Sequence, residues 1–389
     1  MKLSQKMSRL GTETAFKVLA KAQALEAKGI DVVHLEIGEP DFDTPKNICE
    51  AATKALGEGQ THYCNSQGIV PLRVEIAKQI ERTRSISVDT ECVIVTPGAK
   101  PIMFYSILAL LEEGDEAIYP NPGFPIYESV INFTGAKAVP IPLREELDFR
   151  FDVDELKSKI TPRTKLIIIN SPHNPTGGVL GKDDIRAIAA LAQEHDIIIL
   201  SDEIYENIIY EDKPYSIASL PGMLDRTILL SGFSKTYAMT GWRLGYAVVP
   251  PGLVDPIVGL IVNSVSCTAP FIQHAGIQAL TGPQDSISRM VNEFKKRREL
   301  IVDGLNAIPG ISCLRPKGAF YVFPNVKKLR MNCQQLADYL LNEAGVATLA
   351  GTGFGKYGEG YIRLSYAPSQ ENIRKALERI KTAVAKLAV

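Results

Sequence analysis

The sequence predicts an α/β fold in which a mostly parallel sheet lies between layers of helices. Short runs of continuous apolar residues recur through the middle of the chain, as at residues 165–170 and 227–231, and helix-like segments such as 182–195 separate them. Strands that are apolar throughout are buried on both faces, which is typical of a parallel sheet covered by crossover helices. At 389 residues the chain is also long for one hydrophobic core, which favours a large domain and a smaller one.

The large domain is predicted at residues 46–285. Its strands are expected at residues 92–96, 116–119, 165–170, 197–201 and 227–231, and helices at 101–111 and 182–195. Turn residues end several of these runs, as Pro97 and Gly98 do after the first strand. Ligands of open parallel sheets bind beyond the carboxyl ends of the strands, so we expect a site there.

The second predicted domain is a smaller α+β unit, in which residues 286–389 are joined by the N-terminal segment 1–45. A charged helix is expected at residues 289–306, followed by short strands at 311–314 and 319–323, a helix at 333–344, a strand at 361–365 and a closing helix at 370–386. The change from long buried strands to short ones places the boundary near residue 285.

The charge balance and the cysteine pattern argue against several classes of partner. With 43 basic and 44 acidic residues the net charge is −1, so neither nucleic acid nor an anionic membrane is expected to bind. No apolar run reaches the roughly 18 residues that span a bilayer, and the first residues lack a secretory apolar core. The six cysteines and five histidines show no metal-ligand spacing. We therefore expect a cytoplasmic protein without a metal.

The most informative residue is Lys235, which lies among small residues and is followed eight positions later by Arg243. A lysine amine condenses with an aldehyde, and a guanidinium clamps a phosphate. Pyridoxal 5'-phosphate (PLP) carries both groups, so the pair suits this cofactor. An isolated Lys–Arg pair is more often a solvated surface pair. The interpretation therefore depends on whether other residues fit other edges of the same cofactor.

Three polar segments at strand ends fit those edges. After the first strand, Gly98 precedes a helix start whose backbone amides can hold a phosphate. Asn174 lies in a polar turn, which is either a plain connection or a source of a hydrogen bond to the cofactor's phenolic oxygen. Asp202 follows the next strand, either as a helix cap or as the carboxylate that keeps the pyridine nitrogen protonated. Tyr205, three residues on, could reach the phenolic oxygen from the other side.

Together these motifs resemble those of the class I aminotransferase family of fold-type I PLP enzymes, and of its aspartate aminotransferase branch in particular. The matching pieces occur in the family's order and span nearly the whole chain, at residues 174–177, 202–205, 233–235, 241–245 and 361–365. The resemblance implies that Lys235 forms the Schiff base with PLP and carries the proton between the substrate Cα and the cofactor. It implies a large PLP-binding domain and a small domain, as the strand pattern does.

The resemblance also implies the remaining cofactor contacts. The phosphate would be bound by Arg243, with Ser234 and the turn formed by Gly98, Ala99 and Lys100. Asp202 would pair with the ring nitrogen, and Asn174 and Tyr205 with the phenolic oxygen. Phe124 would stack on the pyridine, with a core phenylalanine as the alternative. Tyr63 matches a tyrosine that reaches the phosphate of the neighbouring subunit, which implies a homodimer. Some members have a serine at the position of Gly232, and its absence here makes the phosphate depend more on the other contacts.

The substrate contacts implied by the resemblance involve four residues. Arg363 would grip the α-carboxylate through a bidentate pair that lysine could not reproduce. The backbone of Gly38 and the side chain of Asn174 would lie beside that carboxylate. Lys100 matches a lysine that meets a distal carboxylate in some aspartate aminotransferases, and its alternative is a helix-start lysine that points to solvent.

The resulting hypothesis is a PLP-dependent aminotransferase that moves an amino group from an L-amino acid to a 2-oxo acid by a ping-pong mechanism, with aspartate or glutamate as candidate donors. A PLP-dependent β-lyase or amino-acid oxidase on the same fold is the nearest alternative, because the surroundings of Lys235 do not fix how the electrons released at Cα leave. A non-catalytic ligand-sensing module is a remote alternative, since such modules accompany DNA-binding domains for which this chain has no room.

Overall fold

The protein is described by a computed structural model that covers residues 2–211 and 215–387, and its core is a seven-stranded sheet. The strand order is β2 (Val93–Thr96), β8 (Gly245–Val248), β7 (Thr227–Gly232), β6 (Ile198–Asp202), β5 (Thr164–Asn170), β3 (Glu116–Asn121) and β4 (Lys137–Pro142). The pairs from β7 to β4 are all parallel, and β8 alone runs antiparallel to its neighbours β2 and β7. The predicted fold class, a mostly parallel sheet between helices, is confirmed.

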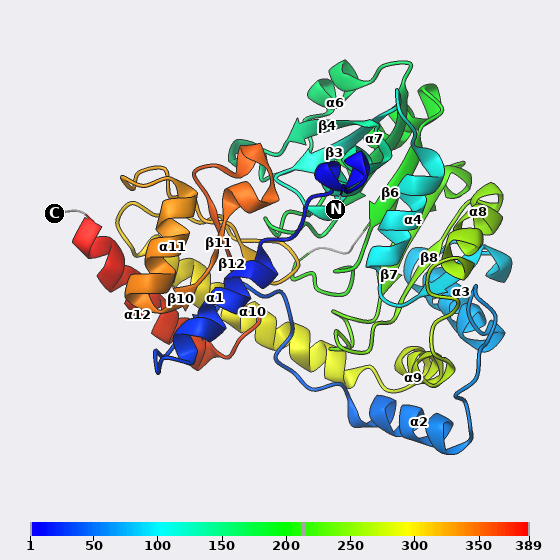
Figure 1. The fold of residues 1–389 in the computed structure, drawn as a ribbon, viewed down its shortest axis with the longest axis horizontal. Coiled ribbons are helices and arrows are strands. Elements are labelled where there is room, and N and C mark those ends of the chain that lie inside the picture. The colour runs from blue at the N-terminus through cyan, green and yellow to red at the C-terminus, as the bar shows by residue number, and fades with distance from the viewer. Residues whose placement is uncertain (1, 212–214, 388–389) are drawn as a thin grey trace.

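Helices cover both faces of this sheet, which explains the continuous apolar strands (Figure 1). They are α3 (Val70–Arg84), α4 (Lys100–Leu110), α5 (Ile126–Thr134), α6 (Val153–Lys159), α7 (Lys182–Glu194), α8 (Pro251–Val262) and α9 (Pro270–Thr281), and α2 (Lys46–Gly57) packs against α9. In β5, Leu166 and Ile168 pack with α4, α5 and α8, whereas Ile167 and Ile169 pack with α6 and α7. Because successive side chains point to opposite faces, a strand covered on both faces must be apolar at every position.

The C-terminal part of the chain and the N-terminal segment pack together. The elements are α1 (Ala15–Glu26), β1 (Val33–His34), α10 (Asp285–Asn306), β9 (Tyr321–Val322), α11 (Cys333–Ala344), β10 (Val346–Ala347), β11 (Leu349–Ala350), β12 (Ile362–Ser365) and α12 (Gln370–Leu387). Strand β1 pairs in parallel with β10, and β12 lies between β11 and β9. Figure 1 shows α1 beside α11 and β10. The division into residues 46–285 and residues 1–45 with 286–389 stays a prediction.

Several predicted elements differ from the structure. The strand expected at 311–314 is wrong, because only Ser312 forms an isolated bridge, with Asn325. The helix expected from residue 289 begins at Asp285, and the strand expected at 319–323 is only two residues long. Strands β4 and β8 were not predicted. Strand β4 carries two prolines, which an edge strand tolerates, and β8 is a four-residue strand that begins inside the 241–245 motif. No helix of the described part of the chain combines the length and apolar character needed to cross a membrane.

Candidate active site

A cavity of about 570 Å³ lies where the parallel strands end, and it brings most of the predicted site residues together. Strand β6 ends at Asp202, the chain after β7 supplies Lys235, and β12 carries Arg363. The predicted residues that line it are Gly38, Ala99, Lys100, Phe124, Asn174, Asp202, Tyr205, Ser234, Lys235, Arg243 and Arg363. Gly98 and Tyr63 are the two predicted residues that do not line it. Residues separated by more than 300 positions therefore meet at one sheet edge, as the strand-end rule predicts.

Asp202 is a buried carboxylate that lines the cavity. Its Oδ2 accepts a hydrogen bond of 2.6 Å from the Tyr127 hydroxyl, and its Oδ1 accepts one of 3.2 Å from the amide of Ile204. Burial raises the pKa of Asp202 to about 6, and the two hydrogen bonds act in the opposite direction. A cationic partner in the cavity would stabilise the carboxylate and lower this pKa. A protonated pyridine nitrogen is such a partner.

Lys235 lies on the wall of the same cavity. Its Nζ donates a hydrogen bond of 2.5 Å to the carbonyl of Gly38 and lies 5.8 Å from the centroid of the Phe320 ring. Burial lowers the pKa of Lys235 to about 8, Arg363 and Arg243 lower it further, and Glu39 opposes them. A lysine with a lowered pKa holds a larger neutral fraction at physiological pH, and the neutral amine is the nucleophile that attacks a carbonyl carbon.

Tyr205 is fixed by a second tyrosine that the sequence did not single out. The hydroxyls of Tyr205 and Tyr321 lie 2.7 Å apart, and both side chains are buried. Gly38 packs against the same hydroxyl, because a Cβ added at Gly38 would lie 1.9 Å from the Tyr321 oxygen. Any side chain at position 38 would displace Tyr321, so glycine is required for this close approach.

Arg363 is a buried cation, and none of its contacts in the described part of the chain is with an acidic side chain. Its Nη1 donates to Asn174 Oδ1 at 3.3 Å, its Nη2 donates to the carbonyl of Glu36, and its Nε has no hydrogen-bond partner. The rings of Tyr321 and Phe354 lie 4.6 and 5.0 Å from the guanidinium carbon. Burial lowers the pKa of Arg363, and no side chain within residues 2–211 and 215–387 forms an ion pair with it. A buried, unpaired guanidinium is costly, and a bound carboxylate would supply the missing partner.

The other end of the cavity is built from a helix start and a second arginine. Ala99 caps α4 and Lys100 is its first residue, so the amides of this turn have no partner within the helix. Gly98 has φ +87°, and a Cβ added there would lie 2.2 Å from a guanidinium nitrogen of Arg243. Gly98 therefore acts behind the cavity wall, by letting Arg243 approach the helix start. Backbone amides and a guanidinium at a helix N-terminus form an anion site that suits a phosphate.

Lys100 reaches into the cavity but already has a partner. Its Nζ forms an ion pair with Glu13 and lies 5.5 Å from the ring centroid of Phe124 and 5.8 Å from that of Phe16. Glu13 and Phe16 come from the N-terminal segment, which the sequence analysis did not connect with the site. Lys100 is therefore neither buried nor wholly solvated: 43 % of its side chain is exposed.

Tyr63 does not contribute to this cavity. Its side chain is 88 % exposed, and it lines a separate hollow of about 480 Å³ with His62 and Phe271. A role of Tyr63 in a neighbouring subunit's site stays a prediction.

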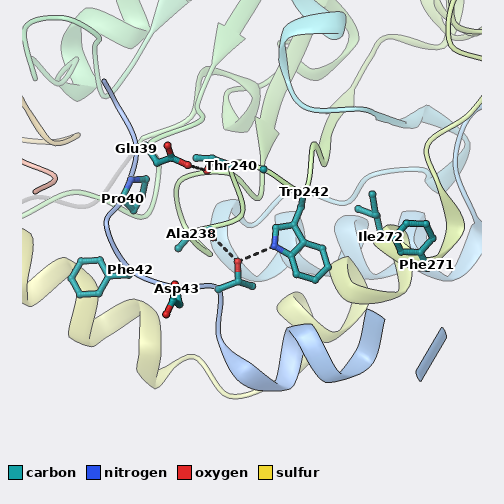
Figure 2. Close-up of a pocket in the computed structure, with 11 residues that line it drawn as sticks. Glu39, Pro40, Phe42, Asp43, Ala238, Thr240, Trp242, Phe271 and Ile272 are labelled. Atoms are coloured by element: carbon teal, nitrogen blue, oxygen red, sulfur yellow. Dashed lines mark hydrogen bonds between the residues drawn. The ribbon is translucent and has the colours of Figure 1, made fainter. Parts of the chain in front are cut away.

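The N-terminal segment is fastened to the loop that precedes Arg243, as Figure 2 shows. The indole Nε1 of Trp242 donates to Thr44 Oγ1 at 2.9 Å, and Thr44 Oγ1 donates to the carbonyl of Ala238 at 2.6 Å. The hydroxyl of Thr240 donates to Glu39 in the same hollow, whose volume is about 440 Å³. These contacts hold residues 39–44 beside the cavity, although no local sequence pattern links the two segments.

The donors and acceptors around the cavity fit PLP. The α4 start and Arg243 match its phosphate, the buried Asp202 matches a protonated ring nitrogen, and Tyr205 lies within the same wall for the phenolic oxygen. Lys235 supplies an amine for its aldehyde. The buried Nε of Arg363 has no partner among the described residues, so the cavity also suits a second anion.

Comparison with known proteins finds similar chains over nearly the whole length of this one. The family model for aminotransferase class I and II matches residues 30–380. An aspartate aminotransferase of Pyrococcus abyssi is 43 % identical over 355 residues, which are 90 % of this chain and 91 % of that protein. The aromatic-amino-acid aminotransferase 2 of Thermococcus litoralis is 39 % identical over 98 % of each chain. The solved structure of Thermus thermophilus aspartate aminotransferase with maleate is 38 % identical, with a TM-score of 0.95 over 98 % of this chain and 100 % of that one.

Proposed function

The chain belongs to the aminotransferase class I and II family and is a PLP-dependent transaminase, and from that premise we propose that its amino donors are the acidic amino acids aspartate and glutamate. The amino group passes to a 2-oxo acid in two half-reactions, with ping-pong kinetics. When bound, PLP supplies an electron-accepting ring. The proposal concerns the side chain of the amino donor that binds beside the cofactor.

The observation that carries the proposal is the pair of cations that line one cavity, Arg363 and Lys100. Arg363 offers an unpaired guanidinium for the α-carboxylate that every amino acid has. Lys100 offers an ammonium group for a second carboxylate, which only acidic donors have. In the structure Glu13 is paired with this ammonium group. A partly exposed pair of this kind is worth about 0–1 kcal/mol, so a substrate carboxylate can replace Glu13 at little cost.

The proposed roles of the other residues follow from their surroundings. We assign Lys235 to cofactor attachment and to proton transfer from the substrate Cα, because its lowered pKa favours the neutral amine. Asp202 is assigned to the ring nitrogen, and Tyr205 and Asn174 to the phenolic oxygen. The phosphate is assigned to Arg243, Ser234 and the Gly98–Lys100 turn, and one face of the ring to Phe124.

The test mixes the holoenzyme with single amino acids, without an acceptor, and follows the absorbance of the bound cofactor. We expect stoichiometric conversion to the pyridoxamine form, fastest with aspartate and glutamate. The Lys100→Ala variant should lose rate with these donors and keep its rate with alanine. Equal rates for acidic and neutral donors in the unaltered enzyme would contradict the substrate assignment. Steady release of ammonia would instead indicate the lyase or oxidase alternative.

Aromatic amino acids are a second candidate class. The rings of Phe16 and Phe124 flank the Lys100 amine, so an aromatic side chain can pack there while the Glu13–Lys100 pair stays formed. The relative from Thermococcus litoralis is named for aromatic substrates. Phenylalanine and tyrosine therefore belong in the same donor series, and we expect them to rank below aspartate.

We also propose a cytoplasmic homodimer in which Tyr63 reaches the partner's phosphate site. The exposed Tyr63 ring and the neighbouring Phe271 and Pro270 support a contact with another chain. All six cysteines are thiols, which suits a reducing compartment. Sedimentation should give a dimer. The Tyr63→Phe variant should bind PLP more weakly and should remain a dimer. A monomer with full activity would contradict both statements. Fractionation of the source cells checks the compartment.

A further inference from the structure

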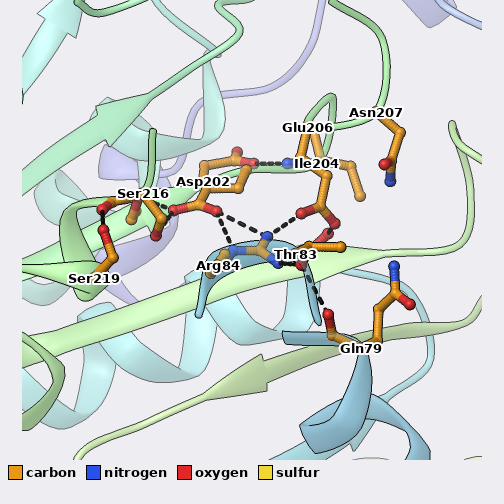
Figure 3. A network of polar contacts seen from close by, with 12 residues as sticks. Gln79, Thr83, Arg84, Asp202, Ile204, Glu206, Asn207, Ser216 and Ser219 are labelled. Carbon is orange, nitrogen blue, oxygen red and sulfur yellow. Dashed lines mark hydrogen bonds and ion pairs between the residues drawn. The ribbon is translucent and has the colours of Figure 1, made fainter. Parts of the chain in front are cut away.

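A buried ionic cluster lies behind the wall of the cavity (Figure 3). Its centre is Arg84, the last residue of α3, whose side chain is only 5 % exposed. Arg84 Nε donates to Glu203 Oε2 at 2.9 Å, and Arg84 Nη2 contacts both Glu203 and Glu206. The side chains of Glu203 and Glu206 are 9 % and 12 % exposed, so the three charged groups are almost entirely removed from water.

The spacing of these acids relates the cluster to the site. Asp202 and Tyr205 line the cavity, and the residue after each of them, Glu203 or Glu206, does not line it and binds Arg84 instead. One guanidinium thus holds Glu203 and Glu206 from behind, while Asp202 and Tyr205, the two groups assigned to the cofactor ring, face the cavity. Because the guanidinium is planar and has several donors, it can fix two carboxylates at once.

Further hydrogen bonds connect the cluster with the strand that leads to Lys235. Ser231, in β7, donates its hydroxyl to Glu206 at 2.9 Å. Ser201 and Ser216 donate to Glu203 at 3.0 and 2.6 Å. These bonds leave the acidic oxygens of the cluster satisfied and tie two separate segments, at Ser216 and Ser231, to the 202–206 stretch.

The cluster is also unbalanced in charge. Two carboxylates face one guanidinium, and the other titratable groups against it, Tyr246 and Tyr237, have pKa values raised by burial and stay neutral. Glu203 acts on Asp202 as a like charge. Removal of a positive charge from this cluster increases the proton affinity of groups in the cavity, and removal of a negative charge decreases their proton affinity.

We propose that Arg84 is a positioning residue of the transamination site, which holds Asp202 and Tyr205 in register and offsets the negative charge behind Asp202. This inference rests on the proposed roles of those two residues. A purely structural ion pair would affect unfolding alone. A positioning role also changes how tightly PLP binds and at which pH the bound cofactor titrates.

The test compares the holoenzymes of Arg84→Gln, Arg84→Lys and Glu206→Gln with the unaltered protein. Arg82→Gln is the matched control, because Arg82 lies on the same helix and is exposed. Five quantities are measured: the absorbance titration of the bound cofactor, the Kd for PLP by equilibrium dialysis, kcat and KM with aspartate, and thermal unfolding.

We expect Arg84→Gln to raise the midpoint of the absorbance titration and Glu206→Gln to lower it, because the two changes remove opposite charges. Misplaced ring contacts should raise the Kd for PLP about tenfold and lower kcat about tenfold to hundredfold. KM should change less than kcat. Arg84→Lys keeps the positive charge but not the planar guanidinium that can bind two carboxylates. The midpoint of its absorbance titration should therefore be unchanged, while its kcat should still fall. Arg82→Gln should match the unaltered enzyme.

An unchanged midpoint in Glu206→Gln, together with unchanged PLP affinity and kcat in Arg84→Lys, would overturn the proposal, whether or not unfolding shifts. These two variants decide the matter if Arg84→Gln does not fold. The titration and the dialysis contain no amino acid. A wrong substrate assignment would therefore appear only as slow amino transfer from aspartate in the unaltered enzyme, and the two failures can be told apart.

Discussion

The lowered pKa of Lys235 makes a direct prediction about how the apoenzyme takes up its cofactor at different pH values. Attack on an aldehyde requires the neutral amine, so the attachment rate follows the neutral fraction of Lys235. With a pKa of about 8 in place of 10.5, roughly one molecule in ten holds the neutral amine at pH 7, against roughly one in three thousand for an ordinary lysine. The rate should therefore rise with pH through about 8 and then level off.

The assay mixes apoenzyme with pyridoxal and records the absorbance change on attachment from pH 6 to pH 10. Pyridoxal lacks the phosphate, so neither phosphate ionisation nor the proposed contact of Arg243 with the phosphate contributes to the profile. Glu39→Gln provides a second check. The Glu39 carboxylate raises the pKa of Lys235, so its removal should move the midpoint to lower pH. A rate that still climbs at pH 10, or a midpoint that Glu39→Gln moves upward, would refute the reasoning.

Three substitutions test other contacts of the cavity. Arg363→Lys should reduce kcat/KM with aspartate about a hundredfold, since an ammonium cannot make the bidentate pair; an effect below threefold would contradict the assignment. Glu13→Gln should lower KM for aspartate by about 1.5- to 5-fold, the worth of a partly exposed ion pair, and leave phenylalanine unchanged; an equal change for both donors would count against it. Gly98→Ala should raise the Kd for PLP at least about tenfold, because φ is +87° and the new Cβ meets the Arg243 guanidinium; dialysis measures it, and an unchanged Kd would rule the account out.

The sequence predicted the parts of the site that local patterns encode. Buried parallel strands appear in the sequence as continuous apolar runs. The polar residues at their ends, such as Asp202 and Asn174, can therefore be identified without a structure. Their partners are not visible, because each comes from a distant segment. Tyr321 meets Tyr205 across 116 positions, and Glu13 meets Lys100 across 87. Only the packing of the C-terminal and N-terminal parts against the sheet edge brings these pairs together.

The same limit explains the missed strands and the missed arginine. Strand β8 is four residues long, and β4 has prolines at an edge, so neither carries the length or the apolar continuity that identified its neighbours. Arg84 looks like an ordinary basic residue at the end of an amphipathic helix. Its burial depends on the two acids of the 202–206 segment, more than a hundred positions away.

The charges of the cavity relate the choice of substrate to the N-terminal segment. In the proposed roles Arg243 binds the cofactor phosphate and Arg363 the α-carboxylate, whereas Lys100 is paired with Glu13. An acidic donor must therefore displace Glu13, and a neutral or aromatic donor can leave the pair in place. We expect the difference between donors to depend on the hold of Glu13 on Lys100, with Arg363 contributing equally to all of them. A series of donors with Glu13→Gln thus separates the two cations: its effect should grow with the charge of the donor side chain and vanish for alanine.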